Sequence, residues 1–284
     1  MINQSQKSKA ETLLALHSGQ GILVLPNIWD PIGARILAAK GYPAVATASA
    51  AVSASLGYKD GEMINRSTLI EVLTRIADSV DVPVTADIET GYGESLPELG
   101  QAIKEVIESG VVGVNIEDRK KDGNLRTVDE QCQRISTVRQ TASSLDVNLV
   151  INARVDSFVT SSFTDKRQAM EEAVTRARAY SAAGADCIYP IGPGDEATVR
   201  ELRNRIDVPI NILGSPTAAP LSLLREIGIN RVSFGPYVFR ACLRKFEEIA
   251  EGLLASNDYG SLSNAMTQAE VAPYLRVGRE QTQG

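Results

Sequence analysis

Eight short apolar segments, separated by amphipathic stretches, are the feature of this sequence that most limits its fold. The segments are rich in valine and isoleucine and almost continuously apolar, as expected for strands buried on both faces of a sheet. They are GILVLPN (21–27), PAVATAS (43–49), PVTADIE (83–89), VVGVNIED (111–118), NLVINARVD (148–156), ADCIYPI (185–191), VPINILG (208–214) and INRVSFG (229–235).

Helical patterns with clear ends alternate with these segments. After the first segment, Asp30 is suited to an N-cap, Pro31 to the first helical position and Gly41 to the end of the helix. Strands that alternate with helices predict a parallel sheet, and eight of them predict a closed α/β fold, the (β/α)8 TIM barrel. A doubly wound open sheet is the alternative, but no GxGxxG motif follows the first segment.

The length of 284 residues suits one barrel domain over residues 1–284, because such barrels take about 250 residues. The segment from about 236 to 284 is longer than one barrel helix requires. We expect it to form a C-terminal helical extension that covers the barrel or reaches a neighbouring subunit. No linker, repeat or low-complexity stretch indicates a second domain.

Charge and cysteine usage narrow the class of protein. A net charge of −6 without a dense Lys/Arg run argues against nucleic-acid binding. No apolar run approaches the roughly 20 residues that span a membrane, and the N-terminus lacks the apolar core of a signal peptide. The cysteines, Cys132, Cys187 and Cys242, are odd in number and far apart, which predicts free thiols and a cytoplasmic location. The only histidine, His17, is expected to be exposed on the first helix, which leaves no His-based triad or zinc site.

Polar residues gather at the ends of the predicted strands, where barrels carry their catalytic groups. In chain order they are Asn27, Trp29 and Asp30; Thr47 and Ser49; Asp87 and Glu89; Glu117 and Asp118; Arg154 and Asp156; Tyr189 and Pro190; Asn211; Ser233 and Gly235. The loop after the second strand adds a further carboxylate, Asp60. Several acids therefore converge on one cation, Arg154. An all-oxygen set without His or Cys favours a hard cation, Mg²⁺ or Mn²⁺.

Each of these residues also has a structural interpretation. Asp30 is suited to capping a helix, Glu117 and Asp118 to starting a solvated loop, and Arg154 to pairing with Asp87 in a salt bridge. Their joint occurrence at one end of one barrel favours a metal site over the separate structural roles.

Four motifs match a known family in order and spacing over about 200 residues: SLGYKDGE (55–62), VTADIETGYG (84–93), GVNIEDR (113–119) and NARVDSF (152–158). With them, the chain resembles the isocitrate lyase/phosphoenolpyruvate mutase superfamily. LPNIWDPIGARI and RVSFGPYVFRA extend the resemblance over most of the chain. It implies a modified (β/α)8 barrel, often with the eighth helix swapped between subunits, in a homodimer or homotetramer. It also implies Mg²⁺ or Mn²⁺ and a small-molecule carboxylate, a 2-oxo or 2-hydroxy acid, as substrate.

The resemblance also implies roles for individual residues. Asp87 corresponds to the direct metal ligand, and Asp60, Glu89 and Glu117 to the groups that hold metal-bound water. Arg154 faces the oxyanion or carboxylate of the substrate and, with Glu117 and Asp60, makes up the catalytic set. The substrate-binding set comprises Ser49 and Ala50, whose backbone N–H groups cradle a carboxylate, and Trp29, Asn211 and Arg154.

One loop departs from the family pattern. The lyases that cleave isocitrate or methylisocitrate carry a KKCGH-type loop whose cysteine acts as the acid. Here Lys120 and Lys121 are followed by Asp122, and Cys132 lies on a helical pattern as a partly buried thiol. The mutase and the phosphonopyruvate hydrolase of the family use a longer loop with PKTNS-like residues. Asn124 is a possible substitute for the asparagine of that loop, but the loop here is shorter and the register does not match. Oxaloacetate decarboxylase-like members also lack the cysteine.

These observations predict a Mg²⁺-dependent lyase. It would split a C–C bond of a small 2-oxo or 2-hydroxy carboxylate through a metal-stabilised pyruvate enolate, by decarboxylation or retro-aldol cleavage. One alternative is a phosphonopyruvate-type mutase or hydrolase that acts on a P–C bond. Another is a protein that binds 2-oxo acids without turnover, against which the intact charged set argues. A Schiff-base aldolase fits poorly, because no lysine ends a predicted strand.

Overall fold

The computed structural model describes residues 2–19, 21–163, 165–255 and 259–275. Its strands are β1 (Leu23–Leu25), β2 (Asn27–Ile28), β3 (Val45–Thr47), β4 (Val84–Asp87), β5 (Gly113–Glu117), β6 (Val150–Val155), β7 (Cys187–Pro190), β8 (Asn211–Leu213) and β9 (Arg231–Ser233). All eight predicted segments contain a strand, and the first contributes both β1 and β2, which Pro26 separates. The pairings between these strands are all parallel, as predicted.

The strands follow one another around the molecule. β2 to β7 form one sheet in sequence order, and β1, β9 and β8 form a second. A parallel bridge between Ile188 and Ile210 connects β7 to the segment that enters β8. At the other junction, Pro26 has no N–H to donate, so the chain changes partner there: β1 pairs with β9 and β2 with β3. This order is the one predicted for a (β/α)8 barrel.

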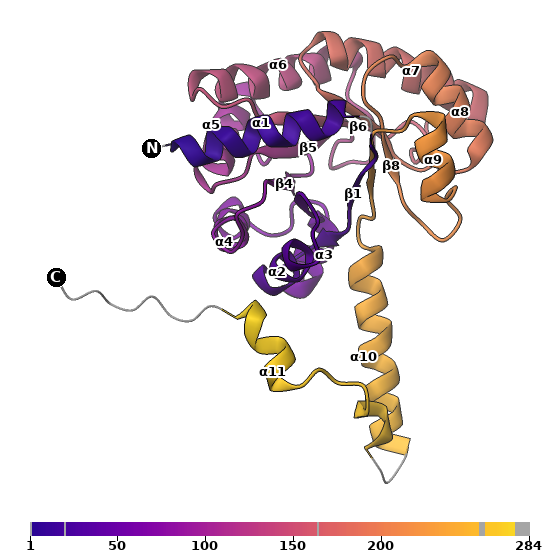
Figure 1. Cartoon of the computed structure of the whole chain (residues 1–284). Helices are drawn as coiled ribbons and strands as arrows, with labels where there is room; N and C mark the ends of the chain where they lie inside the picture. Colours follow the sequence, from indigo (N-terminus) through magenta and orange to yellow (C-terminus); the bar gives the residue numbers. More distant parts are fainter. Residues whose placement is uncertain (1, 20, 164, 256–258, 276–284) are drawn as a thin grey trace, which may run out of the picture.

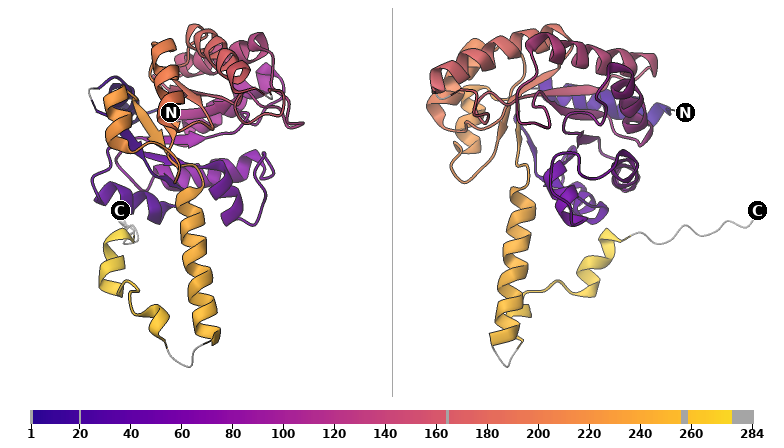
Figure 2. Two further views of the ribbon diagram at one scale, coloured as in Figure 1. Left: turned by 90° about the vertical axis from the view of Figure 1, so that its right-hand side faces the viewer. Right: turned by 180° about the vertical axis from the view of Figure 1, so that it is seen from behind.

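Most of the helices form an outer layer around the strands, whereas those at the C-terminal end project away from it (Figure 1; Figure 2). The helices are α1 (Gln4–Ser18), α2 (Pro31–Ala39), α3 (Ser49–Ser55), α4 (Arg66–Ala77), α5 (Leu96–Glu108), α6 (Val128–Ser144), α7 (Lys166–Ala182), α8 (Glu196–Arg205), α9 (Leu221–Ile227), α10 (Tyr237–Ala255) and α11 (Gln268–Val271), with 3₁₀ turns η1 (Gly260–Leu262) and η2 (Ala272–Tyr274). The predicted cap is present: the Asp30 side chain accepts a hydrogen bond from Gly33 N at 2.7 Å, and Pro31 opens α2.

The core lies between the strands and this outer layer. On α5, Leu99, Ile103 and Ile107 are fully buried at a spacing of four residues, so they share one face. They belong to the same apolar cluster as Val114 and Ile116 of β5. Burying each such side chain stabilises the fold by about 1.5–3 kcal/mol. The apolar packing fixes where the strand ends lie.

The prediction for His17 is wrong, because this side chain is buried. α1 packs against the body of the protein, and Gln6 Nε2 donates to the carbonyl oxygen of Ile107 at 2.6 Å. His17 Nδ1 lies 2.8 Å from the Leu13 carbonyl oxygen, and Nε2 lies 3.4 Å from Nη1 of the buried Arg231. Burial, followed by the charge of Arg231, lowers the pKa of His17 to about 4. Arg231 opens β9, so this neutral imidazole lies at the opposite end of the strands from the predicted site.

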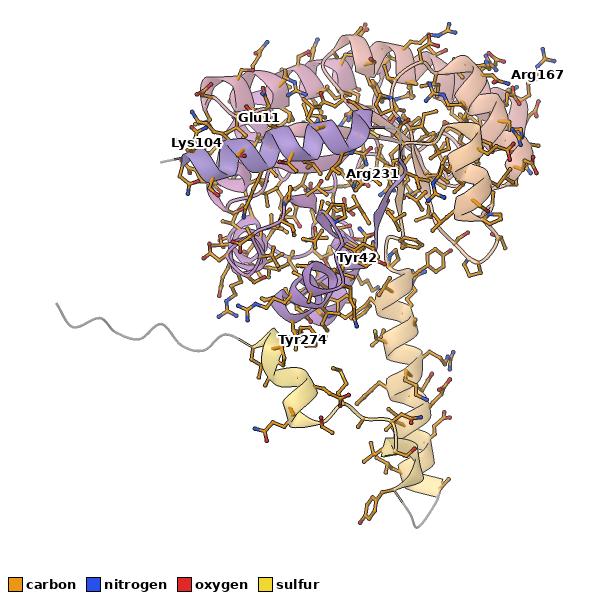
Figure 3. All side chains as sticks on the ribbon, in the orientation of Figure 1. Glu11, Tyr42, Lys104, Arg167, Arg231 and Tyr274 are labelled. Carbon is orange, nitrogen blue, oxygen red and sulfur yellow. The ribbon has the colours of Figure 1, made fainter. Side chains whose placement is uncertain are left out.

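The C-terminal part, as far as it is described, contains α10, η1, α11 and η2. α10 projects from the body of the protein (Figure 1; Figure 2), and its side chains extend into the surrounding space (Figure 3). Phe246 is 70% exposed and Leu254 91% exposed. Arg35 Nη1 donates to the Tyr274 carbonyl oxygen at 3.1 Å, which ties η2 to α2. Residues 256–258 and 276–284 of the predicted extension lie outside the described residues. Among those described, no helix is both long and apolar enough to cross a membrane.

Candidate active site

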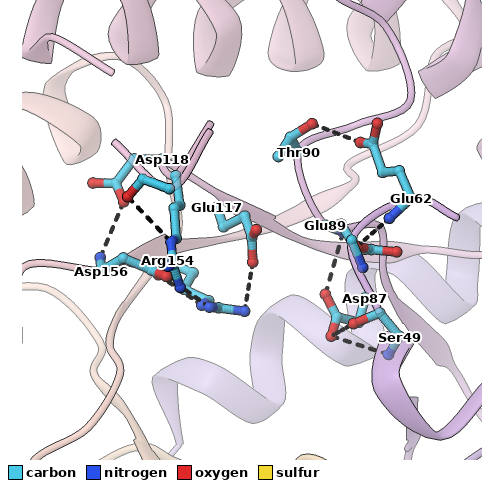
Figure 4. A network of polar contacts seen from close by, with 12 residues as sticks. Ser49, Glu62, Asp87, Glu89, Thr90, Glu117, Asp118, Arg154 and Asp156 are labelled. Carbon is cyan, nitrogen blue, oxygen red and sulfur yellow. Dashed lines mark hydrogen bonds and ion pairs between the residues drawn. The ribbon is translucent and has the colours of Figure 1, made fainter. Parts of the chain in front are cut away.

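The carboxylate of Asp87 is the centre of the acidic cluster at the strand ends. Asp87 is the last residue of β4, and α3 begins beside it at Ser49. Asp87 Oδ2 accepts hydrogen bonds from Ser49 N at 3.1 Å and from Ser49 Oγ at 2.9 Å (Figure 4). The other oxygen, Oδ1, lies 3.3 Å from the donating Glu89 N. These three donors fix the orientation of the carboxylate. α3 itself was not predicted from the sequence.

The turn after β4 brings Glu89 under the loop that carries Asp60. Glu89 is buried, and its Oε2 accepts hydrogen bonds from Gly61 N at 2.7 Å and Glu62 N at 2.6 Å. The Tyr92 hydroxyl donates to Glu89 Oε1 at 3.2 Å. The loop after β3 is therefore held against the turn after β4, and Asp60 lies beside Ser49 and the Asp87 carboxylate.

Unusual backbone conformation is concentrated in this turn. Four described non-glycine residues have a positive φ, namely Glu62, Glu89, Tyr92 and Asp146, and the first three meet here. Such conformations cost on the order of 1–3 kcal/mol each and persist where surrounding contacts hold them. The Glu62 carboxylate supplies such contacts, because it accepts from Thr90 Oγ1 at 2.6 Å and from Tyr92 N at 2.9 Å.

Arg154 lies between two carboxylates, one on the neighbouring strand β5 and one directly after its own strand, β6. Glu117 of β5 lies opposite Arg154 of β6 in the parallel register, and Arg154 Nη1 is 2.5 Å from Glu117 Oε2. Arg154 Nε and Nη2 donate to the two oxygens of Asp156, each at 2.7 Å. A bidentate pair of this kind fixes the plane of the guanidinium. The structural interpretation that Arg154 pairs with Asp87 is therefore wrong, since its ion-pair partners are Glu117 and Asp156.

The cluster carries more negative charge than its cation balances. Burial, and then the carboxylates of Asp60 and Asp87, raise the pKa of Glu89 to about 7. Burial, and then Asp87, also raise the pKa of Asp60. Burial raises the pKa of Glu117 as well, although the neighbouring Arg154 opposes that rise. A bound cation would relieve this repulsion and favour the ionised carboxylates.

The donor set fits a hard cation that keeps part of its water. Among the described residues, no three His, Cys, Asp or Glu side chains are placed to hold one ion together. Mg²⁺ commonly takes only one or two protein carboxylates directly and retains several waters. Asp87 as the direct ligand, with Asp60, Glu89 and Glu117 around it, suits that mode of binding.

The remaining predicted substrate-binding residues have different surroundings. Ala50 follows Ser49 in α3. The ring of Trp29 meets Phe239 of α10 edge-on, with the ring centroids 4.9 Å apart. Asn211 is fully buried, and its Nδ2 donates to Ser233 Oγ at 2.9 Å. Ser49 thus joins the acidic cluster directly, and Trp29 contacts an apolar ring of α10. Asn211 is the first residue of β8, so the prediction that it ends its strand is wrong.

Arg134 is a site-supporting residue that the sequence did not reveal. It lies on α6 and is almost fully buried. Its guanidinium donates to the carbonyl oxygens of Thr90 at 2.6 Å, Gly93 at 2.8 Å and Glu94 at 3.2 Å. The turn that follows Glu89 is therefore held by a helix distant in sequence. One arginine on an amphipathic helix carries no sequence signal for such a role.

The loop after β5 reaches across to the other site loops. Lys121 Nζ lies 3.1 Å from Glu62 Oε2 and 3.1 Å from Glu94 Oε1. The loop itself is a small hairpin, with an antiparallel bridge between Arg119 and Leu125. Cys132 is half-buried on α6, as predicted. The paired lysines were the sequence signal for this loop, but their partners were not predictable.

Comparison with known proteins shows which family the chain resembles. The phosphoenolpyruvate phosphomutase family matches residues 13–254. A 2-methylisocitrate lyase of Bacillus subtilis (strain 168) is 30% identical over 214 residues, covering 72% of this chain and 67% of the relative. An oxaloacetate decarboxylase of Pseudomonas putida (strain GB-1) is 28% identical over 274 residues, 89% of each chain.

A solved structure agrees as well. A protein of Burkholderia cenocepacia J2315, provisionally described as a phosphonomutase, superposes with a TM-score of 0.82 at 35% sequence identity. The superposition covers 87% of this chain and 98% of that one. The family match spans most of the chain, and the strand order is the one that the resemblance implied. The chain belongs to the isocitrate lyase/phosphoenolpyruvate mutase superfamily.

Proposed function

We propose that this protein is a Mg²⁺-dependent carbon–carbon lyase that acts on a small 2-oxo or 2-hydroxy carboxylate. The observation that carries the proposal is the surplus of carboxylates around Asp87, at the mouth formed by the ends of β3 to β6. Burial and mutual repulsion raise the pKa of Glu89 to about 7, which is the electrostatic situation that a divalent cation would relieve.

The residues divide the work as follows. Asp87 would bind the cation, while Asp60, Glu89 and Glu117 would hold its water. A bound divalent cation stabilises negative charge that develops on a substrate oxygen. Arg154 presents a fixed positive charge, because Glu117 and Asp156 hold its guanidinium on two sides. A preorganised charge in a partly buried site lowers the barrier to an enolate without a histidine or cysteine.

The loop after β5 favours the simpler reactions of the family. Asp122 stands where the isocitrate-cleaving lyases carry a cysteine, so decarboxylation or retro-aldol cleavage that needs no thiol acid fits best. The similarity to an oxaloacetate decarboxylase over 89% of both chains supports this choice. We also propose that the protein is a cytoplasmic homodimer or homotetramer.

Phosphorus–carbon chemistry is the second candidate. The matching family is described as phosphoenolpyruvate phosphomutase, and the Burkholderia cenocepacia protein is 35% identical. Asn124 is the residue of the loop after β5 that such a reaction could use. Its backbone N–H donates to Asp122 Oδ1 at 2.9 Å within the hairpin.

The experiment is a product assay with Mg²⁺ that measures pyruvate, or glyoxylate where the substrate is isocitrate, across oxaloacetate, methylisocitrate, isocitrate, other 2-hydroxy acids and phosphonopyruvate, with EDTA as the control. EDTA-sensitive pyruvate or glyoxylate from a carboxylate substrate is the expected result, and the co-product identifies the leaving group. Pyruvate and phosphate from phosphonopyruvate alone would establish the second candidate instead. Binding of Mg²⁺ and a 2-oxo acid without turnover of any of these substrates would indicate a binding protein.

A further inference from the structure

Asp118 is a buried acid whose side chain points away from the acidic cluster around Asp87. It follows Glu117 at the end of β5, and side chains alternate across a strand, so Glu117 faces the barrel mouth while Asp118 faces α7. Asp118 is fully buried. A carboxylate removed from water in this way needs several hydrogen bonds or an ion pair.

Two side chains of α7 and one backbone group supply these partners. Asp118 Oδ2 accepts from Arg176 Nη1 at 3.0 Å and from the Tyr180 hydroxyl at 2.8 Å, and these two donors are themselves 2.7 Å apart. Asp118 Oδ1 accepts from the backbone N–H of Asp156 at 3.0 Å (Figure 4). One carboxylate therefore connects α7 to the residue that holds Arg154.

We propose that Arg176 and Tyr180 are positioning residues for the reaction. They fix Asp118, Asp118 fixes the backbone of Asp156, and the Asp156 carboxylate fixes the guanidinium of Arg154. This inference rests on the proposed function, in which Arg154 faces the developing negative charge.

The residues that connect α7 to Arg154 are buried, and this burial is why a change in one of them affects the next. Asp118 and Asp156 are fully buried and Arg176 almost so, so water cannot replace a lost hydrogen bond. Arginine has a long side chain with many rotamers, and its orientation depends on the groups that hold it. A small displacement of Asp156 would therefore also displace the guanidinium of Arg154, because water cannot replace a hydrogen bond to the buried Asp156 carboxylate.

The test is a double-mutant cycle between Tyr180→Phe and Arg154→Lys. Tyr180→Phe keeps the ring and removes the hydroxyl. We expect kcat to fall about 10-fold while KM and the affinity for Mg²⁺ stay within twofold. In the Arg154→Lys background, Tyr180→Phe should cause no further loss, because residues that act through one another are not additive. Arg176→Lys keeps the charge, loses the planar fork and serves in the same cycle if Tyr180→Phe fails to fold.

The matched control is Val174→Ala. Val174 is buried on the same helix and contacts the apolar core. It should lower the melting temperature without lowering kcat. Two results would overturn the inference in favour of a purely structural role. One is an equal fractional loss of kcat from Tyr180→Phe in the wild-type and in the Arg154→Lys background. The other is a Val174→Ala enzyme whose kcat is as low as that of Tyr180→Phe when the two variants have equal melting temperatures.

A second readout separates this inference from the proposed function. If the wild-type protein turns over none of the substrates, the proposed function fails, and crystal structures of the wild type and Tyr180→Phe decide the inference. A guanidinium of Arg154 displaced from Asp156 in the variant supports it. An unchanged Arg154 with both hydrogen bonds to Asp156 overturns it.

Discussion

Asp87 and Glu89 are separated by one residue, yet their environments differ. Asp87 accepts hydrogen bonds from both the backbone N–H and the hydroxyl of Ser49. Glu89 instead accepts from two backbone N–H groups, and burial, followed by the charges of Asp60 and Asp87, raises its pKa. We therefore propose Asp87 as the direct ligand of a cation, which would favour the ionised form of the nearby Glu89.

Replacing Asp87 with alanine should abolish metal-dependent turnover. The change removes the proposed direct ligand, so the affinity for Mg²⁺ should fall at least about 10-fold while the fold persists. Calorimetric titration with Mg²⁺, beside the product assay, measures both effects. Asp81→Ala, at an exposed acid before β4, is the control and should behave as wild type. Unchanged turnover in Asp87→Ala would refute the site assignment.

The stability of the metal-free protein should depend on the ionisation of Glu89. Its pKa is raised from 4.5 to about 7 in the fold, so between these values the folded state binds more protons than the unfolded state. Stability attributable to Glu89 is then present below about pH 4.5 and is lost as pH rises through 7, by at most about 3 kcal/mol. Denaturant unfolding in EDTA at pH 5 and pH 7.5 measures this loss.

The Glu89→Gln variant should show a smaller loss of stability between these two pH values, because it has no proton to release there. Saturating Mg²⁺ should reduce the loss in the wild type for the same reason, since a cation favours the ionised carboxylate. Glu11→Gln, at an exposed position on α1, is the matched control and should retain the wild-type pH dependence. Identical pH dependence in Glu89→Gln and wild type would show that other groups control the effect.

Two helices of the outer layer, α6 and α7, donate hydrogen bonds to the backbone and side chains next to the site. α6 supplies Arg134 to the turn after β4, and α7 supplies Arg176 and Tyr180 to Asp118. In each case a side chain of the helix satisfies oxygens at the end of a strand. The helices thus fix the backbone from which the site residues extend, in addition to covering the sheet.

Replacing Arg134 with methionine should loosen the turn that carries Glu89. Three carbonyl oxygens lose their donor, so we expect a loss of about 3 kcal/mol in unfolding free energy. The affinity for Mg²⁺ should fall about 10-fold, as is typical for groups that orient metal-site residues. Equilibrium unfolding and calorimetric titration measure the two effects.

Arg139→Met is the matched control for this variant, on the same helix. Arg139 donates to the carbonyl oxygens of Leu149 and Gly184 rather than to the site turn. It should lose stability and keep its affinity for Mg²⁺. If Arg134→Met binds Mg²⁺ as well as Arg139→Met does, Arg134 supports the fold without supporting the site.

On the scale of the whole molecule, α10 is a long helix that leaves several large apolar side chains exposed in the described part of the chain. The exposed side chains include Leu243, Phe246 and Leu254, of which Phe246 is 70% exposed. An exposed apolar helix face of this kind marks an interaction surface. We propose that α10 packs against a second copy of the chain, as the eighth helix does when it is swapped between subunits.

Phe246→Glu should therefore lower the oligomeric state. A charge placed in an apolar contact between subunits must be desolvated, so the variant should shift toward the monomer. Light scattering coupled to size-exclusion chromatography measures the mass. Lys245→Glu introduces the same carboxylate at the neighbouring exposed position and should keep the wild-type mass. A wild-type monomer at all concentrations would contradict the proposal.

The sequence by itself determined the order of the strands and the identity of the acidic strand ends. Val/Ile-rich segments that are apolar on both faces can be buried only in a covered parallel sheet, and helix caps such as Asp30 depend on neighbouring residues alone. For the same local reason, Asp87, Glu89, Glu117 and Arg154 could be assigned to the ends of strands before their contacts were known.

Only the tertiary structure decided which groups meet. Arg154 pairs with Glu117 and Asp156, the turn after β4 is held by Arg134, and His17 is buried against Arg231. Apart from the pair of Arg154 and Asp156, which are two residues apart, these contacts join residues on different elements that lie far apart in the sequence. They depend on the curvature of the sheet and the packing of the helices, which the pattern of one segment does not contain.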